Sequence, residues 1–378
     1  MKGFTNCNIY VEGKGIIKTS LEIKDGKIHK IGDFNGGNNL PDNLYVIPGF
    51  VDQHVHGGNH SDAMYPTQED ILNISKTIAS EGVTSFLATT MTQSEENIIN
   101  ALENLKTYIK SKYKEGAEVI GVHLEGPFIS KKYKGAQPEE FIVPCDVETY
   151  KRYEEASGEK IKIVTLAYEE NGEELTKYLV KKNVVVSLGH TDATAKDVFE
   201  AVSNGATCAT HCYNAMKGLH HREAGTVGAS MLSSDVYCEL ISDLIHVCPE
   251  AIQILFKLKG MDKIILITDG MEAKHLSDGD YKLGGQTVHV IGKEARLDSG
   301  NLAGSTLYMN EAVRNIKNVL NLTMEEAINL ATINPSKNIN VFDQKGSIKV
   351  GKDADFVIVD KDFNVFETIR GGNTIYKK

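Results

Sequence analysis

Histidine and acidic residues at the ends of short apolar runs are the first chemically informative feature of this 378-residue chain. His54-Val55-His56 follows one such run, which ends at Val51-Asp52. In a strand, residues i and i+2 point to the same face, so both imidazoles would lie on one side. Because neutral imidazole is the commonest metal ligand, the pair favours a metal site. Two exposed histidines in a glycine-rich loop are the alternative.

Four other apolar runs also end in residues that can bind a metal. The residues at these ends are His123 and Glu125 before Gly126-Pro127, His190 before Thr191, His211 before Cys212, and Asp269 after the run that ends at Ile267. Since His123 and Glu125 are two residues apart, both face the same way and the spacing does not choose between them. Asp269 is also compatible with a helix N-cap.

The types of these residues indicate which metals would bind. Nitrogen and oxygen ligands without a thiolate suit Zn²⁺, Fe²⁺, Mn²⁺ or Co²⁺. Three protein ligands plus water is the pattern of a catalytic metal, since a structural site would be closed. Such a metal lowers the pKa of bound water from about 15.7 to about 7. Asp269 is then the candidate that takes a proton from that water and delivers it to a leaving group.

Charge and composition restrict the classes of function. The formal net charge is -10, from 41 basic and 51 acidic residues. A general nucleic-acid binder needs a basic face, so we expect no nucleic-acid partner. The apolar runs are too short to span a bilayer and no secretory signal is visible, so we expect a cytoplasmic protein without a membrane partner. The six cysteines, none in a C-x-x-C pair, are expected to be free buried thiols.

Eight apolar runs alternate with stretches of helical period from residue 45 onward. The expected strands are 45–51, 84–88, 119–124, 161–166, 184–188, 207–210, 236–241 and 263–268, and the expected helices include 67–80, 94–112, 171–182 and 194–204. Strands of this length alternating with helices imply a parallel sheet. Eight βα units predict an α/β fold, a closed (β/α)8 TIM-like barrel. A doubly wound open sheet is the alternative, but the Gly-x-Gly-x-x-Gly turn expected there is absent.

Both ends of the chain differ in texture from the middle. Near the N-terminus, alternating apolar residues flank Asp25-Gly26, which is a hairpin signal. After two further expected helices, 309–320 and 323–333, strand-like runs return up to residue 375. The simplest arrangement is a small β-sandwich domain formed by residues 1–48 and 346–378, with a barrel of residues 49–345 inserted between its two parts.

The barrel prediction also predicts where the chemistry lies. Active sites of such barrels form at the C-terminal ends of the strands, because that face carries the βα loops. The candidates fall at the ends of strands one, three, five, six and eight: His54 with His56, Glu125, His190, His211 and Asp269. This common placement favours one shared metal site over a separate structural role for each residue.

Longer motifs add a resemblance to a known family. The order H-x-H, Glu, His, His, Asp on a barrel flanked by β modules resembles the amidohydrolase superfamily. Within it, the strings at 123–128 (HLEGPF), 189–191, 211–216 (HCYNAM) and 268–270 resemble the N-acetylglucosamine-6-phosphate deacetylases, and the similarity covers essentially the whole chain. The resemblance implies an amide hydrolase of amino-sugar catabolism, which converts N-acetyl-D-glucosamine 6-phosphate to D-glucosamine 6-phosphate and acetate.

The resemblance also implies roles for the metal-binding candidates. Glu125, His190 and His211 would hold the main divalent metal. His54 and His56 match a second metal position that only some members have, so one or two metals per subunit are expected, with Zn, Fe, Mn or Co as the candidates. Asp269 resembles the catalytic acid/base.

Other residues match the substrate contacts of the family. They are Gln137, Asn214, Ala215, Arg222, His246, Leu302, Ala303 and Gly304. The resemblance implies a homodimer in which Arg222 reaches the phosphate in the neighbouring active site, and the forked guanidinium suits that ligand. Gln137 departs from the family, since some members have histidine there. Glutamine donates a hydrogen bond but cannot shuttle a proton, so we expect it to orient the sugar or the acetyl oxygen.

Three other functions are compatible with parts of this pattern. The same chemistry could act on the galactosamine 6-phosphate epimer or on another cyclic amide. A catalytically silent barrel that serves as an interaction protein would be expected to lack metal ligands or Asp269, yet all of them are present. A phosphate-binding barrel without metal is the third alternative, and metal analysis distinguishes it.

Overall fold

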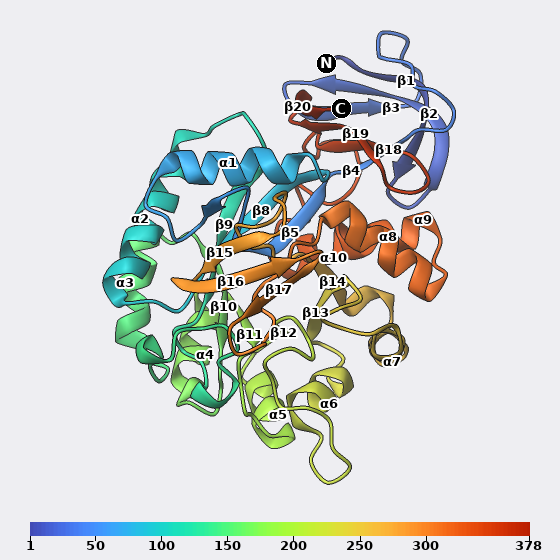
Figure 1. The fold of residues 1–378 in the computed structure, drawn as a ribbon. Coiled ribbons are helices and arrows are strands. Elements are labelled where there is room, and N and C mark those ends of the chain that lie inside the picture. The colour runs from blue at the N-terminus through green and yellow to red at the C-terminus, as the bar shows by residue number, and fades with distance from the viewer.

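An eight-stranded parallel barrel forms the centre of the molecule (Figure 1). The computed structural model describes residues 1–378. Its barrel strands pair in the order β5 (Phe50–Val55), β8 (Val83–Thr90), β9 (Glu118–Glu125), β10 (Ile161–Leu166), β11 (Val185–Leu188), β12 (Cys208–Ala209), β13 (Tyr237–Ile241) and β14 (Ile264–Ile267). This confirms the predicted (β/α)8 fold and excludes the open doubly wound sheet.

The prediction of one strand over 45–51 was wrong, because two strands of different sheets lie there. β4 (Tyr45–Pro48) belongs to the terminal sheet, and β5 starts at Phe50 in the barrel. Gly49 lies at the junction, where a Cβ atom would come within 2.2 Å of the Thr84 side chain. Only glycine allows so close an approach between backbone and neighbour.

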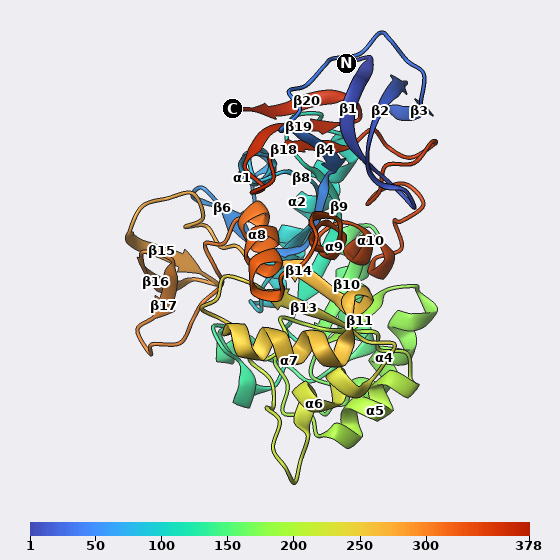
Figure 2. The same cartoon turned by 90° about the vertical axis from the view of Figure 1, so that its right-hand side faces the viewer.

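Helices surround the barrel (Figures 1 and 2). They are α1 (Gln68–Ala79), α2 (Glu95–Ser111), α3 (Val147–Ser157), α4 (Gly172–Lys181), α5 (Ala195–Ser203), α6 (Gly225–Leu232), α7 (Pro249–Lys259) and α8 (Met309–Leu320), with short 3₁₀ turns at η1 (Lys131–Tyr133), η2 (Glu139–Phe141) and η3 (Met261–Lys263). Thr67, Ser94 and Thr194 cap α1, α2 and α5 by accepting a backbone N–H in the first turn. All four helices predicted between the strands are confirmed.

The predicted helix over 323–333 is instead interrupted. α9 (Met324–Leu330) ends before Ala331, and α10 (Ile333–Asn338) starts two residues later. Pro335 explains the break, because proline lacks a backbone N–H and clashes with the carbonyl four residues earlier inside a helix. It is tolerated in the first turn of a new helix, which is its position in α10.

The first and last barrel strands meet only at their C-terminal ends. The Asp269 backbone N–H donates to the His54 carbonyl at 2.9 Å, and the His56 N–H donates to the Gly270 carbonyl at 2.9 Å. A parallel bridge joins Val55 and Gly270. The seam that closes the barrel therefore brings the H-x-H motif beside Asp269.

The two chain ends form one small sheet next to the barrel (Figure 2). Its seven strands pair in the order β20 (Asn373–Lys377), β19 (Val365–Arg370), β18 (Phe356–Val359), β4, β1 (Gly3–Val11), β2 (Gly15–Lys24) and β3 (Lys27–Ile31). Phe4 of β1 and Phe356 of β18 pack edge to face, with ring centroids 5.7 Å apart. A small β unit built from both termini is confirmed, and its strands hydrogen-bond as one continuous sheet.

A three-stranded antiparallel sheet after β14 was not predicted. It consists of β15 (Gly279–Leu283), β16 (Gln286–Ile291) and β17 (Glu294–Leu297). A separate pair of short strands, β6 (Gly57–Gly58) and β7 (Ser61–Asp62), follows the H-x-H motif. Gly284-Gly285 between alternating apolar residues is the hairpin signal that would have found the three-stranded sheet. The sheet packs through Val288 and Val290 onto Met271, just beyond the end of β14.

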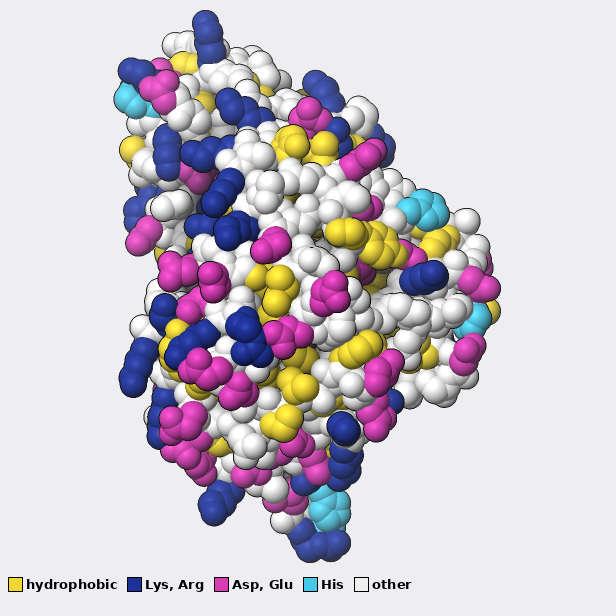
Figure 3. All heavy atoms as spheres, turned by 90° about the vertical axis from the view of Figure 1, so that its left-hand side faces the viewer, with side chains coloured by type: hydrophobic (Ala, Val, Ile, Leu, Met, Phe, Trp, Pro, Cys, Tyr) yellow, Lys and Arg dark blue, Asp and Glu magenta, His cyan; other side chains and the backbone are white.

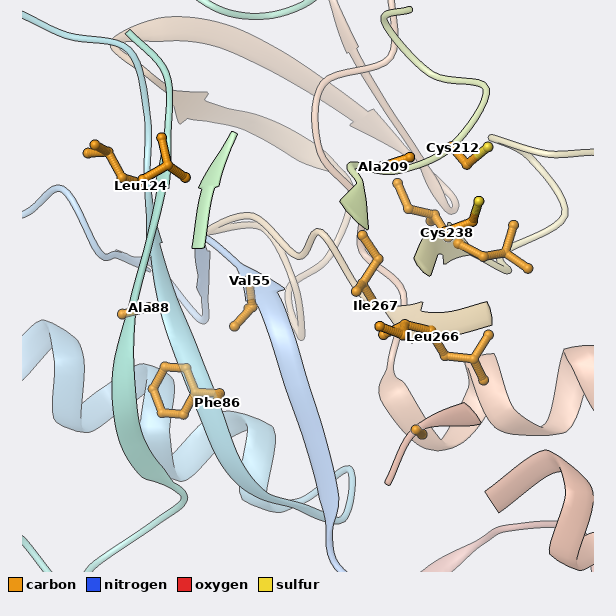
Figure 4. Close-up of a cluster of buried hydrophobic side chains, with 14 of the residues drawn as sticks. Val55, Phe86, Ala88, Leu124, Ala209, Cys212, Cys238, Leu266 and Ile267 are labelled. Atoms are coloured by element: carbon orange, nitrogen blue, oxygen red, sulfur yellow. The ribbon is translucent and has the colours of Figure 1, made fainter. Parts of the chain in front are cut away.

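Buried apolar side chains fill the space within and around the barrel (Figure 4). Five of the six cysteines are buried free thiols, and Cys248 is an exposed one. The prediction of free thiols is therefore confirmed, and that of burial fails at Cys248. None of the helices combines the length and apolar character needed to cross a bilayer.

Charges of both signs are interspersed on the surface. On the face formed largely by the helices near the N-terminal half of the barrel, Lys and Arg alternate with Asp and Glu (Figure 3).

Lys345 provides a stability test of the junction between the two units. Its Nζ lies 2.9 Å from Asp355, 3.1 Å from Asp353 and 2.8 Å from Glu118 at the start of β9. Lys345→Met would leave the buried Asp355 carboxylate without its cation, and breaking a buried pair costs about 3–5 kcal/mol. We expect chemical denaturation to report a loss of that size. Lys349→Ala removes an exposed pair with Glu12 and should cost less than about 1 kcal/mol; equal losses would contradict the assignment.

Candidate metal-dependent active site

Glu125, at the end of β9, lies at the centre of a cluster of imidazoles. Its Oε1 is 3.2 Å from His190 Nε2 and 3.1 Å from His211 Nε2. The same oxygen is 3.4 Å from His54 Nε2, and Oε2 is 3.3 Å from His56 Nε2. The structure thus brings together residues from four strand ends that are far apart in the sequence.

Asp269 completes the cluster on the side of the closing seam. Its Oδ1 lies 3.3 Å from His56 Nε2 and 3.6 Å from His54 Nε2. The six side chains fall into two groups of three that could each hold a metal, Glu125 with His190 and His211, and Asp269 with His54 and His56. Glu125 faces both groups.

The other ring nitrogen of each histidine is held by a hydrogen-bond acceptor. His190 Nδ1 faces the Tyr133 carbonyl at 3.0 Å, His211 Nδ1 the Asn214 carbonyl at 3.1 Å, and His56 Nδ1 the Thr89 carbonyl at 3.2 Å. A carbonyl only accepts, so each Nδ1 must carry the proton. In a neutral imidazole, the Nε2 lone pair is then directed towards Glu125.

These lone pairs require a positive charge among them. His190 Nε2 and His211 Nε2 are 3.1 Å apart, close to the ~3.3 Å edge of a tetrahedral site with bonds of about 2.0–2.1 Å. His54 Nε2 is buried and has no hydrogen-bond partner in the protein. No Lys or Arg forms an ion pair with Glu125 or Asp269. The donor set therefore fits a divalent cation bound through nitrogen and oxygen.

The electrostatics of the cluster agree with this conclusion. Burial opposes charge, but the imidazoles around Glu125 hold its pKa well below the usual range, and His54 and His56 lower the pKa of Asp269 to about 2. In return, Asp269 and Glu125 raise the pKa of His56 to about 10 against the effect of burial. A cation entering this site would displace the imidazole protons that otherwise balance the carboxylates.

The backbone is strained where three of these side chains leave the strands. The φ angles of His190, His211 and Asp269 are 47°, 28° and 50°, in the left-handed region that residues with a Cβ rarely adopt. Such residues cluster at functional sites, where the surrounding structure compensates their cost. No helix starts after Asp269, so the alternative interpretation of this residue as a helix N-cap was wrong.

The choice between His123 and Glu125 is decided by their neighbours. His123 is fully buried, with Nδ1 facing the Gln53 carbonyl at 3.1 Å and Nε2 facing Thr165 Oγ1 at 2.7 Å. Burial together with the His54 charge lowers its pKa to about 3. Both ring nitrogens have protein partners, so His123 has a structural role and Glu125 faces the cluster.

A cavity of about 480 Å³ opens above the cluster. Of the predicted substrate residues, it is lined by Gln137, Asn214, Ala215, His246, Leu302 and Gly304. Gln137 is buried and bridges the site, since its amide Nε2 donates to Glu125 Oε2 at 2.9 Å and its Oε1 accepts from the Thr92 N–H. His246 is oriented by Asp243, whose Oδ2 is 2.6 Å from Nδ1.

Two predicted residues lie elsewhere. Ala303 is fully buried and packs beneath the three-stranded sheet with Met271 and Val288. Arg222 is exposed on a loop before α6 that extends away from the barrel in Figures 1 and 2, and it does not line the cavity of its own chain.

Several groups that complete the site were not predicted from the sequence. Lys132 and Arg296 line the cavity, and Glu239 in β13 contacts His54 from behind. Glu239 had a usable signal, because it is an acidic residue within an otherwise apolar barrel strand. A fully buried carboxylate there requires a specific partner. The Tyr133, Asn214 and Thr89 carbonyls had no signal, since every residue has a carbonyl.

Comparisons with known proteins agree with this architecture. A model described as the amidohydrolase family matches residues 45–375. The chain belongs to the amidohydrolase family. Among its members, the N-acetylglucosamine-6-phosphate deacetylase of Bacillus subtilis (strain 168) is 42% identical over 97% of this chain and 95% of the relative. The N-acetylgalactosamine-6-phosphate deacetylase of Escherichia coli O157:H7 is 36% identical over 91% of each.

Solved structures of N-acetylglucosamine-6-phosphate deacetylases superimpose over nearly the whole chain. The N-acetylglucosamine-6-phosphate deacetylase of Thermotoga maritima has a TM-score of 0.91 at 34% identity, covering 99% of each chain. A single-residue mutant of the N-acetyl-D-glucosamine-6-phosphate deacetylase of Mycobacterium smegmatis, in complex with N-acetyl-D-glucosamine-6-phosphate, has a TM-score of 0.92 at 27% identity, again covering 99% of each.

Replacing Glu125 tests the metal interpretation without an activity assay. Glu125→Gln removes the negative charge that faces all four imidazoles, so we expect the purified protein to lose most of its divalent metal, measured by elemental analysis after dialysis. Glu118→Gln changes the same residue type at the opposite end of β9 and should retain the metal. Equal metal contents in the two variants would rule out Glu125 as a ligand.

Proposed function

We propose that this chain is a metal-dependent hydrolase that removes the N-acetyl group of N-acetyl-D-glucosamine 6-phosphate, giving D-glucosamine 6-phosphate and acetate. The convergence of Glu125, Asp269 and four imidazole lone pairs at the floor of a cavity carries the proposal. The names of the relatives, at up to 43% identity, support the substrate.

The two groups of three ligands define the proposed metal positions. Glu125, His190 and His211 would hold one cation, and His54, His56 and Asp269 would hold a second one. Zn, Fe, Mn and Co suit nitrogen and oxygen donors without a thiolate. When bound, such a cation polarises the scissile carbonyl and makes water a nucleophile at neutral pH.

The protein's own groups would orient the substrate and move the proton. Asp269 is ionised at neutral pH, so it starts as an acceptor: it takes a proton from the attacking water and returns it to the departing amine nitrogen. The Gln137 amide already donates to Glu125 and can turn a second N–H towards the acetyl oxygen. Asn214, the Ala215 backbone and His246 would contact the sugar phosphate from the cavity wall.

The phosphate contact by Arg222 would come from a second copy of the chain. Arg222 lies on an exposed loop, and its Nη1 is 2.8 Å from His221 Nε2 rather than near a carboxylate. An extended loop that carries a guanidinium can reach a neighbouring cavity, and the guanidinium fork matches two phosphate oxygens. A homodimer with reciprocal Arg222 contacts follows, and the stretch from Leu302 to Gly304 would cover the bound sugar.

The galactosamine epimer is a second candidate substrate. It is supported by the relative named N-acetylgalactosamine-6-phosphate deacetylase, which is 36% identical. The two sugars differ only in the orientation of one hydroxyl group, so a small change in the cavity wall would exchange the preference.

Acetate release tests the function directly. We expect rapid release from N-acetyl-D-glucosamine 6-phosphate, loss of the activity after chelation, and recovery after a divalent metal is returned, because the cluster needs a cation to bring its lone pairs together. The galactosamine epimer and the unphosphorylated sugar are measured beside it. Absence of release with metal restored would discard the deacetylase proposal.

The same assay tests the partner residue. In Arg222→Ala, the preference for the phosphorylated over the unphosphorylated sugar should decrease, whereas Arg152→Ala, an exposed arginine on α3 paired with Glu95, should leave it unchanged. An unchanged preference in Arg222→Ala would remove Arg222 from the substrate site.

Asp269→Asn tests the proton transfer. Asparagine keeps the size of the side chain but cannot accept the proton, and general acid–base catalysis contributes about 10²–10⁴-fold. We expect kcat to fall by that factor in steady-state assays, with metal retained at the Glu125, His190 and His211 position. Wild-type turnover in this variant would exclude Asp269 as the acid/base.

A further inference from the structure

Glu239 is a fully buried carboxylate directly behind the metal-binding cluster. Its Oε2 lies 3.1 Å from His54 Nδ1 and accepts from the His211 backbone N–H at 3.2 Å. Its Oε1 accepts from the Gln53 amide at 2.6 Å. One side chain of β13 therefore contacts a residue of each proposed metal position.

His54 differs from the other three imidazoles in the group that its Nδ1 atom faces. The Nδ1 atoms of His56, His190 and His211 face neutral backbone carbonyls, whereas that of His54 faces the charged Glu239. A carboxylate behind a ligating histidine orients the ring and makes its other nitrogen a stronger donor. His54 Nε2 is also fully buried and has no hydrogen-bond partner in the protein.

Glu239 has no cation of its own. No Lys or Arg forms an ion pair with it, and its only ion-pair partner in the protein is His54. A buried charge without compensation is costly, so the positive charge that balances Glu239 must act through His54. Gln53 is itself held in place, because Asn338 donates to its Oε1 at 3.1 Å.

We propose that Glu239 is the positioning residue that decides whether the His54, His56 and Asp269 position is occupied by a metal. This inference rests on the proposed metal-dependent function and adds to it a determinant of metal number. Glu239 supplies the negative charge and fixes the proton on His54 Nδ1. The Glu125, His190 and His211 position depends on it only through one backbone contact and is expected to persist without its charge.

The experiment counts metals in the Glu239→Gln variant. Glutamine can still accept from His54 and from the His211 N–H but carries no charge. Wild type and variant are saturated with Zn²⁺, passed over a desalting column and analysed for metal per subunit, and each affinity is measured by competition with a chromophoric chelator. We expect two metals in the wild type and one in Glu239→Gln, with a 10–100-fold weaker second site and an unchanged first site.

The control is Ser242→Ala, which removes a buried hydrogen bond to the Ala312 carbonyl directly after β13. It should bind two metals with wild-type affinities. Thermal melting is recorded for each variant, and if Glu239→Gln fails to fold, Gln53→Met serves in its place, since it removes one donor to Glu239 and should also weaken only the second metal.

Three results would overturn the proposal: two metals bound with wild-type affinity in the variant, loss of both metals, or a single metal in the saturated wild type. Acetate release by the same samples separates this inference from the proposed function. Activity together with an unchanged metal count refutes the role of Glu239 alone, whereas selective loss of one metal in a protein without deacetylase activity refutes the substrate alone.

Discussion

The carboxylate of Glu125, surrounded by imidazole lone pairs in a buried site, is the constraint on which the rest of the active site depends. No side-chain ammonium or guanidinium balances it. Three of the imidazoles are held by backbone carbonyls and the fourth by Glu239, so their Nε2 atoms cannot turn away. These hydrogen bonds hold the Nε2 atoms and the Glu125 carboxylate close together. A divalent cation is the ligand that makes this arrangement favourable.

The barrel makes this arrangement possible because parallel strands end at one rim. Its closing seam is itself part of the site, since the backbone bonds between His54 and Asp269 and between His56 and Gly270 join the last strand to the first. Loss of that pairing would both open the barrel and separate Asp269 from its imidazoles. The buried pair of Lys274 and Glu81, 2.8 Å apart, anchors the segment that follows Asp269.

The terminal sheet and the three-stranded sheet lie at different places on the barrel. The terminal sheet holds both chain ends beside the barrel and connects to it through Lys345, far from the metal cluster. The three-stranded sheet after β14 packs on the site segment at Met271, and the cavity wall continues from it through Arg296 and Leu302. The two sheets therefore contact different parts of the barrel, and of the two only the three-stranded sheet contributes residues to the cavity wall.

The sequence alone determined the barrel, the terminal β unit and the residues at the strand ends, because strand period and strand termination are local properties. It left His123 and Glu125 equivalent, since the period of two gives both the same direction. Only the tertiary structure separated them, by placing Thr165 and the Gln53 carbonyl around one and four imidazoles around the other. Glu239, the burial of Ala303 and the outward position of Arg222 were likewise decided by contacts between distant segments, which no local pattern encodes.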